Sequence, residues 1–195
     1  MPRITPLSRS DLAEFEPFFG AIEEVMGFLP NSLLTLGRSP DLLQAFAGLS
    51  GAVLGSSSIN PTLRQLVAYV SSLASGCRYC QAHTSHGAER AGVDAEKLRD
   101  AFEFESSPLF TEAERAALRL ARDAAVVPNQ TTDAHFDALR EHFSEKEIVD
   151  IVAVISLFGW LNRWNDTMAT QLEDPAVAFA ERELGKSGWT VGSHA

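Results

Sequence analysis

Start and stop signals for helices recur along the whole chain, whereas strand-like alternation and the Asn-Gly or Asp-Gly turns of hairpins are nearly absent. Asn60 followed by Pro61 is an N-cap with proline at the first helical position, and Gly76 can end the helix that they open. Helices are expected over residues 40–49, 61–75, 77–91, 111–127, 144–164 and 174–184. The pattern predicts an all-α fold.

Three parts follow one another along the chain. Prolines and glycines break residues 1–39 into short pieces, so we expect an N-terminal helical arm there. A helical domain follows over residues 40–184, and a tail over residues 185–195 has too little apolar content to pack by itself. Gln65–Cys80 and Glu147–Asn162 are apolar segments offset by 82 residues, which favours a domain built from two related helical units.

The charge balance restricts the partners. The chain has 26 acidic and 16 basic side chains and a formal charge of −10, so it repels nucleic acid and anionic lipid. A signal peptide needs an uninterrupted apolar core, and Asp11 and Glu14 stand where that core would lie. The longest apolar stretch, Ile148–Leu161, contains Asp150 and is too short to span a membrane. We therefore expect a cytoplasmic protein without a nucleic-acid or membrane partner. Thiols are kept reduced in that compartment, so a cysteine pair there is more often catalytic or metal-binding than structural.

The two cysteines belong to a row of reactive side chains. Cys77, Cys80, His83 and His86 stand three residues apart in succession, which places neighbours on one face of the helix expected to begin at Cys77. The N-terminus of a helix favours a thiolate, and His83 offers a proton acceptor one turn away. Cys80, nearer to His83, is the expected nucleophile, and Cys77 is the thiol that closes a disulfide with it.

The cysteine pair has three other possible interpretations. Zinc needs four ligands around one ion, yet the four residues of the row spread over roughly 14 Å of helix, so we expect no metal. A c-type haem needs histidine directly after the second cysteine, where Gln81 stands, so we expect no cofactor. A buried, inert pair that shares a core with Tyr79 and Ala82 remains the third possibility.

The other histidines have weaker claims. His86 lies on the same helix face. It is expected either to have a structural role or to lie next to the residues that react. His135, His142 and His194 have no convergent partner in the sequence and are expected at the surface.

The segment CRYCQAHTSHGAERAGV, preceded by PTLRQLVAYVSSLASG, resembles the alkylhydroperoxidase AhpD-like branch of the carboxymuconolactone decarboxylase superfamily. The resemblance covers residues 60–127 best, and LFGWLNRWNDTMA looks like the second helical unit of longer, peroxidase-related members. It implies an all-helical homo-oligomer and an antioxidant peroxidase that reduces hydroperoxides. A dithiol reductant, either a lipoyl-type adaptor or a thioredoxin-like protein, would recharge it. Carried over, Cys80 is the peroxidatic cysteine and Cys77 the resolving one.

Two positions depart from the AhpD pattern. The family's histidine, four residues after the second cysteine, corresponds to Thr84, so that His83 stands one position early and about 100° around the helix. The family's proton-relay glutamate corresponds to Gln65, which cannot exchange a proton at neutral pH. We expect Gln65, Tyr79, Thr84 and His86 to surround the cysteines. A cofactor-free decarboxylase or lyase and a non-enzymatic thiol redox sensor remain as alternative functions.

Overall fold

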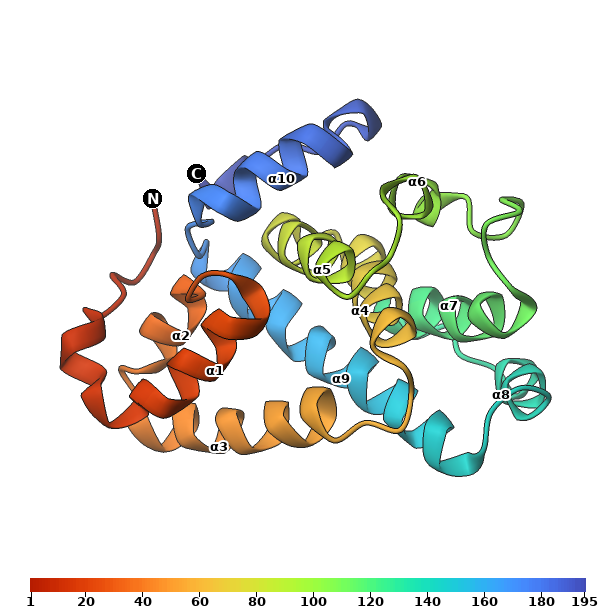
Figure 1. Ribbon diagram of the computed structural model, residues 1–195, viewed down its shortest axis with the longest axis horizontal. Coiled ribbons are helices and arrows are strands. Elements are labelled where there is room, and N and C mark those ends of the chain that lie inside the picture. The colour runs from red at the N-terminus through yellow and green to blue at the C-terminus, as the bar shows by residue number, and fades with distance from the viewer.

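The computed structural model describes residues 1–195, and it confirms the all-α prediction (Figure 1). The ten α-helices are α1 (Glu16–Met26), α2 (Asn31–Leu36), α3 (Pro40–Ser50), α4 (Pro61–Ser75), α5 (Arg78–Arg90), α6 (Ala95–Arg99), α7 (Glu112–Ala125), α8 (Asp133–Arg140), α9 (Glu145–Met168) and α10 (Asp174–Leu184). Short 3₁₀ segments cover Arg9–Phe15, Asp100–Phe102, Gly185–Ser187 and Gly192–His194, and a π-helical turn covers Gly51–Gly55. None of the helices combines the length and the apolar character that crossing a membrane requires.

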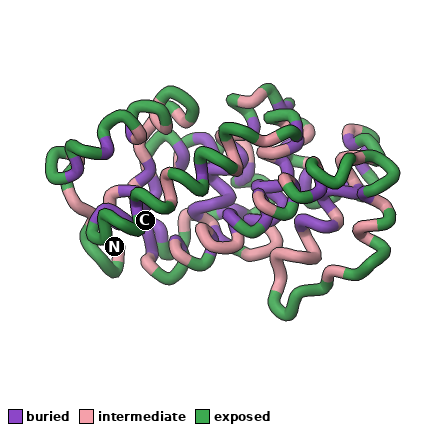
Figure 2. The backbone as a smooth tube through the Cα atoms, turned by 90° about the horizontal axis from the view of Figure 1, so that it is seen from below, coloured by how far each residue is buried: buried purple, intermediate pink, exposed green.

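Helix α4 is the centre of the main core. It packs against α5, α7 and α9, and α5 in turn carries α10 on its outer side (Figure 1). Apolar residues surround α4 on several faces, so Leu66, Val67 and Tyr69 are fully buried. The tube in Figure 2 shows the buried residues concentrated along these inner helices. Burial on several sides stabilises α4 strongly and fixes its C-terminal end, from which α5 departs.

The ends of α4 follow from local chemistry, as predicted. The Asn60 side chain accepts a hydrogen bond of 2.8 Å from the backbone N–H of Leu63, and Pro61 is the first helical residue. Gly76 ends the helix with a φ of +79°, in the left-handed region that glycine enters without a steric penalty. The predicted capping boxes at Thr111 and Ser144 are also present at the starts of α7 and α9.

The N-terminal 39 residues contain a 3₁₀ segment and the helices α1 and α2. Their apolar side chains build a second, smaller core, which includes Leu12, Phe19 and Leu36. Trp160 and Trp164 of α9 pack against this cluster, so it rests on the main helical body. One of the glycines expected to break this segment, Gly20, lies inside α1 instead.

The tail over residues 185–195 packs against its own chain. Trp189 is buried and donates a hydrogen bond of 3.3 Å to the carbonyl of Arg78. The carbonyl of His194 accepts a hydrogen bond of 2.9 Å from the N–H of Leu172. The prediction that His194 is a surface residue is therefore wrong, because its side chain is only 1% exposed. Hydrogen bonds and one large aromatic residue supply the anchoring that the low apolar content of the tail seemed to exclude.

Candidate active site

The CxxC motif lies at the N-terminus of α5, as predicted. The left-handed Gly76 turns the chain out of α4, and Cys77 then forms the N-cap of α5 in an extended conformation. The Cys77 sulfur accepts a hydrogen bond of 3.4 Å from the backbone N–H of Cys80. Both cysteines are free thiols and both are buried. The motif thus places two thiols within one helical turn, in contact with the positive end of the α5 dipole.

The surroundings of Cys77 oppose the loss of its thiol proton. Hydrogen bonding of Cys77 to Cys80 raises the pKa of the Cys77 thiol well above its usual range, and burial raises it further. A negative charge on Cys80 acts in the same direction. Cys77 is therefore a thiol that holds its proton strongly.

Polar groups from α9 and α5 surround Cys80. The Asn165 amide nitrogen lies 3.6 Å from the Cys80 sulfur, within hydrogen-bond distance for sulfur, and also donates to the carbonyl of Leu161 at 3.0 Å. The carbonyl oxygen of the Asn165 side chain is buried and has no partner. The Thr84 hydroxyl donates to the Cys80 carbonyl at 2.6 Å. Asn165 thus offers a donor to a thiolate at Cys80 and leaves an acceptor free beside it.

His83 is held by a carboxylate that lies 90 residues away in the sequence. Its Nε2 lies 2.5 Å from the Glu173 carboxylate at the start of α10. The same carboxylate accepts the Tyr79 hydroxyl at 3.0 Å and the backbone N–H of Asn31 at 2.5 Å. The rings of Tyr79 and Phe28 flank the imidazole, with centroids 4.1 and 5.1 Å from it. His83 therefore belongs to a buried network of Tyr79, Glu173 and His83 on the outer side of α5.

The protonation of this network follows from its charges. Burial opposes ionisation of Glu173, but the positive charge of His83 and the hydrogen bonds from His83 and Asn31 outweigh it, so the pKa of Glu173 is lowered. Glu173 is consequently a carboxylate at neutral pH.

The remaining residues expected around the cysteines have structural contacts. Gln65 lies against Gly87, where an added Cβ would be 3.1 Å from its Oε1 atom. His86 stacks on Phe28 with centroids 5.7 Å apart, and burial lowers the pKa of His86. Thr84 is occupied with the Cys80 carbonyl. The positions that hold the relay glutamate and histidine in the AhpD pattern thus carry no acid–base pair here.

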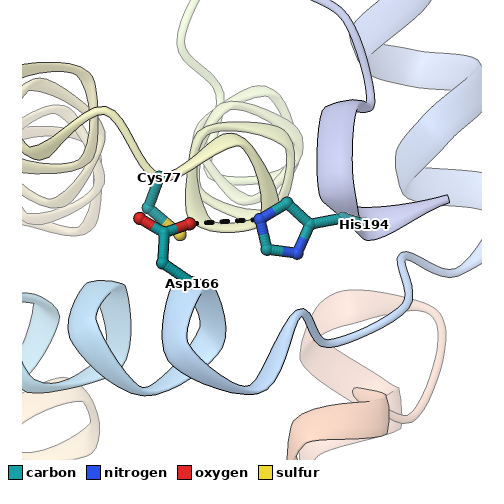
Figure 3. A group of neighbouring side chains, drawn as sticks. All are labelled: Cys77, Asp166 and His194. Carbon is teal, nitrogen blue, oxygen red and sulfur yellow. Dashed lines mark hydrogen bonds and ion pairs between the residues drawn. The ribbon is translucent and has the colours of Figure 1, made fainter. Parts of the chain in front are cut away.

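A second histidine–carboxylate pair lies beside Cys77 (Figure 3). His194 Nε2 is 3.1 Å from Asp166 Oδ1 of α9, and His194 Nδ1 donates to the Thr170 carbonyl at 2.8 Å. The Cys77 sulfur, an Asp166 oxygen and a His194 ring nitrogen all lie within 4.8 Å of one another. A divalent ion could use this donor set only by breaking the histidine–aspartate hydrogen bond and by occupying the Cys77 thiol.

A cavity of about 1100 Å³ opens between α4, α7 and α9. Its wall includes Ser75 at the end of α4, Val126 after α7, and Trp160, Asn162 and Asp166 of α9. Both polar side-chain atoms of Asn162 are buried and have no partner. Asp166 connects this wall to Cys77, because it also belongs to the cluster in Figure 3. The cavity lining includes neither cysteine, so the cavity and its unsatisfied amide are linked to the dithiol site through Asp166.

Sequence reasoning missed four polar residues of this site, namely Asn165, Asp166, Glu173 and His194. Asn165 and Asp166 follow Asn162 by three and four residues in the last part of α9, so the three side chains share one face of the helix. This row of polar side chains is the feature of the sequence that could have identified Asn165 and Asp166. Glu173 and His194 gave none, because only tertiary packing brings them to α5.

Comparison with known proteins places the chain in a family. The sequence profile of the carboxymuconolactone decarboxylase family matches residues 40–123, which include the CxxC motif. An uncharacterized protein of Bacillus subtilis (strain 168), YdfG, is 31% identical over 111 residues, which are 56% of this chain and 73% of that protein. The chain therefore belongs to the carboxymuconolactone decarboxylase family.

Solved structures agree with this assignment over nearly the whole length. The apo structure of the debrominase Bmp8 superposes with a TM-score of 0.86 at 42% identity, covering 91% of this chain and 96% of that one. A cysteine-to-alanine variant of Bmp8 in complex with 2,3,4-tribromopyrrole superposes with a TM-score of 0.87 at 41% identity, covering 92% and 96%. A peroxidase-related protein from Ralstonia eutropha JMP134 with an alkylhydroperoxidase AhpD core shares the fold, with a TM-score of 0.76, 24% identity and coverage of 90% and 94%.

Proposed function

We propose that this protein is a dithiol reductase of small organic electrophiles, in which the Cys77–Cys80 pair is oxidised from dithiol to disulfide. The observation that carries the proposal is the asymmetry of the two buried thiols at the N-terminus of α5. Cys77 retains its proton, and Cys80 has the Asn165 donor at its sulfur. Cys80 is thus equipped to attack as a thiolate, and Cys77 to close the disulfide.

The substrate class that fits best is a halogenated aromatic ring. The Cys80 thiolate attacks the halogen, the carbon–halogen bond breaks, and its electron pair stays with the carbon, which takes a proton. Cys80 then carries a sulfenyl halide. Cys77 attacks that sulfur, halide leaves, and the thiol proton is released. In total the substrate gains two electrons and one proton, and the dithiol becomes a disulfide that an external dithiol reduces.

We assign to His83 the role of donating the proton that the ring carbon of the substrate takes up. Its Nε2 atom lies 2.5 Å from the Glu173 carboxylate, and the residue lies one helical turn beyond Cys80. Tyr79 keeps the carboxylate oriented through its 3.0 Å hydrogen bond. The free amide of Asn162 and the aromatic Trp160 suit the binding of a polar heteroaromatic ring in the adjoining cavity.

The similarity to Bmp8 supports this choice, since 42% identity extends over 91% of the chain. Bmp8 is a debrominase, and its cysteine-to-alanine variant was captured with a tribromopyrrole. Both facts belong to that protein. They make brominated pyrroles the first compounds to test on this one.

Reduction of hydroperoxides is the second candidate, favoured by the CxxC motif itself. The Cys80 thiolate would attack the O–O bond, an alcohol would leave with a proton, and Cys77 would convert the sulfenic acid to a disulfide with loss of water. The absence of an acid–base pair at Gln65 and Thr84 weakens this candidate relative to the first. His83 with Glu173 would have to protonate the leaving alkoxide instead.

Assays of both substrate classes test the proposal. Reduced protein is mixed with a panel of polybrominated pyrroles and bromophenols, or with alkyl hydroperoxides. Dithiothreitol, dihydrolipoamide or thioredoxin regenerates the dithiol, and bromide release or peroxide loss is followed. We expect turnover of at least one class that Cys80→Ser abolishes. Turnover that survives loss of both thiols would instead indicate a lyase. An oligomer that changes with redox state without any turnover would indicate a sensor.

A further inference from the structure

We infer that the His194–Asp166 pair is the proton acceptor for the Cys77 thiol when the disulfide closes, so that the segment after α10 completes the active site. This inference rests on the proposed dithiol chemistry and adds a second acid–base group to it. It assigns one pair of residues to each half of the reaction: His83 and Glu173 to the substrate, His194 and Asp166 to the resolving thiol.

The resolving thiol needs such an acceptor. Cys77 is fully buried, and its hydrogen bond to Cys80, together with burial, raises its pKa well above the usual range. A neutral thiol is a poor nucleophile, so closure of the disulfide requires that this proton be removed. His83 is paired with the buried Glu173 and does not belong to the cluster around the Cys77 sulfur, which consists of Asp166 and His194.

The geometry at His194 leaves one nitrogen for proton exchange. Nδ1 donates to the Thr170 carbonyl at 2.8 Å, which fixes both the ring orientation and the proton on that nitrogen. Nε2 faces Asp166 at 3.1 Å, and the Cys77 sulfur lies within 4.8 Å of both partners. Nε2 can accept the Cys77 proton once its own proton has left through Asp166, whose side chain is open to solvent. With the Cys77 proton the ring forms an ion pair with Asp166, which favours the transfer.

The proton also has a route out of the site. The Asp166 side chain is 46% exposed and lines the large cavity, whereas His194 is buried. A proton taken from Cys77 can therefore pass through the pair to solvent. When an external dithiol opens the disulfide, the same pair can return a proton to the departing Cys77 thiolate.

Several charged and titratable groups lie near the His194–Asp166 pair. Arg3 donates to the carbonyls of Asp166 and Thr167 at the end of α9, at 3.0 and 2.6 Å. The charged and titratable groups near His194 are Asp166 on α9, Cys77 and Tyr79 on α5, Arg3 and the Met1 ammonium on the N-terminal segment, and the Ala195 carboxylate. Among them, the thiol of Cys77 is the group whose proton the reaction must move.

The step balances without an external base. Cys77–SH and the oxidised Cys80 sulfur form the S–S bond, and halide or hydroxide leaves with the electron pair of the broken Cys80 bond. The thiol proton moves to His194 Nε2. Two electrons have already passed from Cys80 to the substrate, so closure needs no further oxidant.

A stopped-flow experiment with 4,4′-dithiodipyridine isolates this step from the natural substrate. The reagent is uncharged, so the formal charge of −10 does not repel it. The first thiopyridone is released when Cys80 attacks and the second when Cys77 closes the disulfide. Both are followed by absorbance between pH 5 and pH 9 in the presence of EDTA. Cys77→Ser, which should release only one, assigns the phases.

For His194→Gln we expect an unchanged first phase and a second phase slowed by about 10²-fold near neutral pH. The wild-type second phase should rise with pH and level off, whereas that of His194→Gln should keep rising about tenfold per pH unit, because only the free thiolate then reacts. Asp166→Asn should slow the same phase with a smaller factor. His135→Gln is the matched control, since His135 forms a comparable 2.9 Å pair with Asp123 away from the site.

Several results would overturn the inference. A second phase in His194→Gln within twofold of the wild type and with the same pH profile would do so. Equal slowing of both phases in both variants would reduce the pair to a structural role. A closure rate that requires an added divalent ion would favour a metal centre. None of these depends on which substrate the protein reduces, so failure of the substrate assays would leave the test intact.

Discussion

Two imidazole–carboxylate pairs flank the CxxC motif, and they differ in their access to water. In the His83–Glu173 pair the side chains are 8% and 9% exposed, whereas in the second pair His194 is 1% and Asp166 is 46% exposed. Tyr79 lies between them, with its ring 4.1 Å from that of His83 and 5.8 Å from that of His194. A buried pair keeps a proton for use inside the site, and a pair open to a cavity can exchange one with solvent. The difference suits one pair to the substrate and the other to the thiols.

Removing the attacking thiol has the largest expected effect. Cys80→Ser should reduce turnover by at least about 10³-fold, because a serine hydroxyl is not ionised at neutral pH and cannot form the disulfide. Bromide release and peroxide consumption measure the loss. Cys77→Ser serves as the comparison and should still consume about one equivalent of substrate. An unchanged rate in Cys80→Ser would contradict the assignment of the nucleophile.

Breaking the buried pair should cost more stability than any other single polar change in the site. Glu173→Gln leaves His83 without a counter-charge in a buried position, so the free energy of unfolding should fall by about 3–5 kcal/mol. Urea unfolding followed by circular dichroism measures it. Glu181→Gln, on the exposed face of the same helix, is the control and should change stability little. Equal losses in both variants would mean that the pair is not the cause.

The same pair predicts a pH dependence. Because the pKa of Glu173 is lowered in the folded state, its ionisation stabilises the fold above the ordinary value of 4.5, and this contribution is lost as the pH falls below 4.5. The stability difference between the wild type and Glu173→Gln should therefore be full at pH 6–7 and shrink toward pH 3. Unfolding curves at several pH values measure it. A difference independent of pH would show that the lost stability is not electrostatic.

A substitution of Asn162 tests whether the cavity beside the two pairs binds the substrate. Its amide is buried and unpartnered, so Asn162→Leu should leave stability unchanged or raise it. If the amide contacts the substrate, KM should rise about tenfold while kcat changes little, because binding is lost and the reacting groups remain. Steady-state kinetics on the best substrate of the panel separates the two parameters. A fall in kcat at constant KM would place Asn162 in the chemical step instead.

The His194–Asp166 pair should contribute less to the stability of the fold than the His83–Glu173 pair. Asp166→Asn is expected to reduce the free energy of unfolding by no more than about 1 kcal/mol, since solvent screens a carboxylate that is 46% exposed. The same urea measurement applies, with Glu173→Gln as the reference. A loss as large as that of Glu173→Gln would remove the contrast between the pairs.

The sequence predicted what local chemistry determines. Asn60, Gly76 and the capping boxes fix helix ends through bonds within three or four residues, and the CxxC motif at the start of α5 follows from them. The assignment of catalytic roles to Cys77, Cys80 and His83 stays a prediction. The structure adds Asn165 at the Cys80 sulfur, Glu173 at His83 and the pair beside Cys77.

These additions depend on contacts between distant segments. Glu173 lies 90 residues beyond His83 and reaches it because α10 packs along α5. His194 belongs to a tail whose composition argued against packing, yet Trp189 and the Leu172 hydrogen bond anchor it. Composition describes the average behaviour of a segment, and here one buried ring and two backbone contacts decided the outcome.

Trapping the oxidised cysteine tests the central claim most directly. Cys77→Ser is exposed to one equivalent of substrate, with dimedone present to capture a sulfenic acid, which a sulfenyl halide also yields with water. Peptide mass spectrometry then locates the label. The account predicts dimedone on Cys80, dependent on substrate, and a Cys77–Cys80 disulfide without label in the wild type. Absence of label on Cys80, while substrate is still consumed, would contradict it.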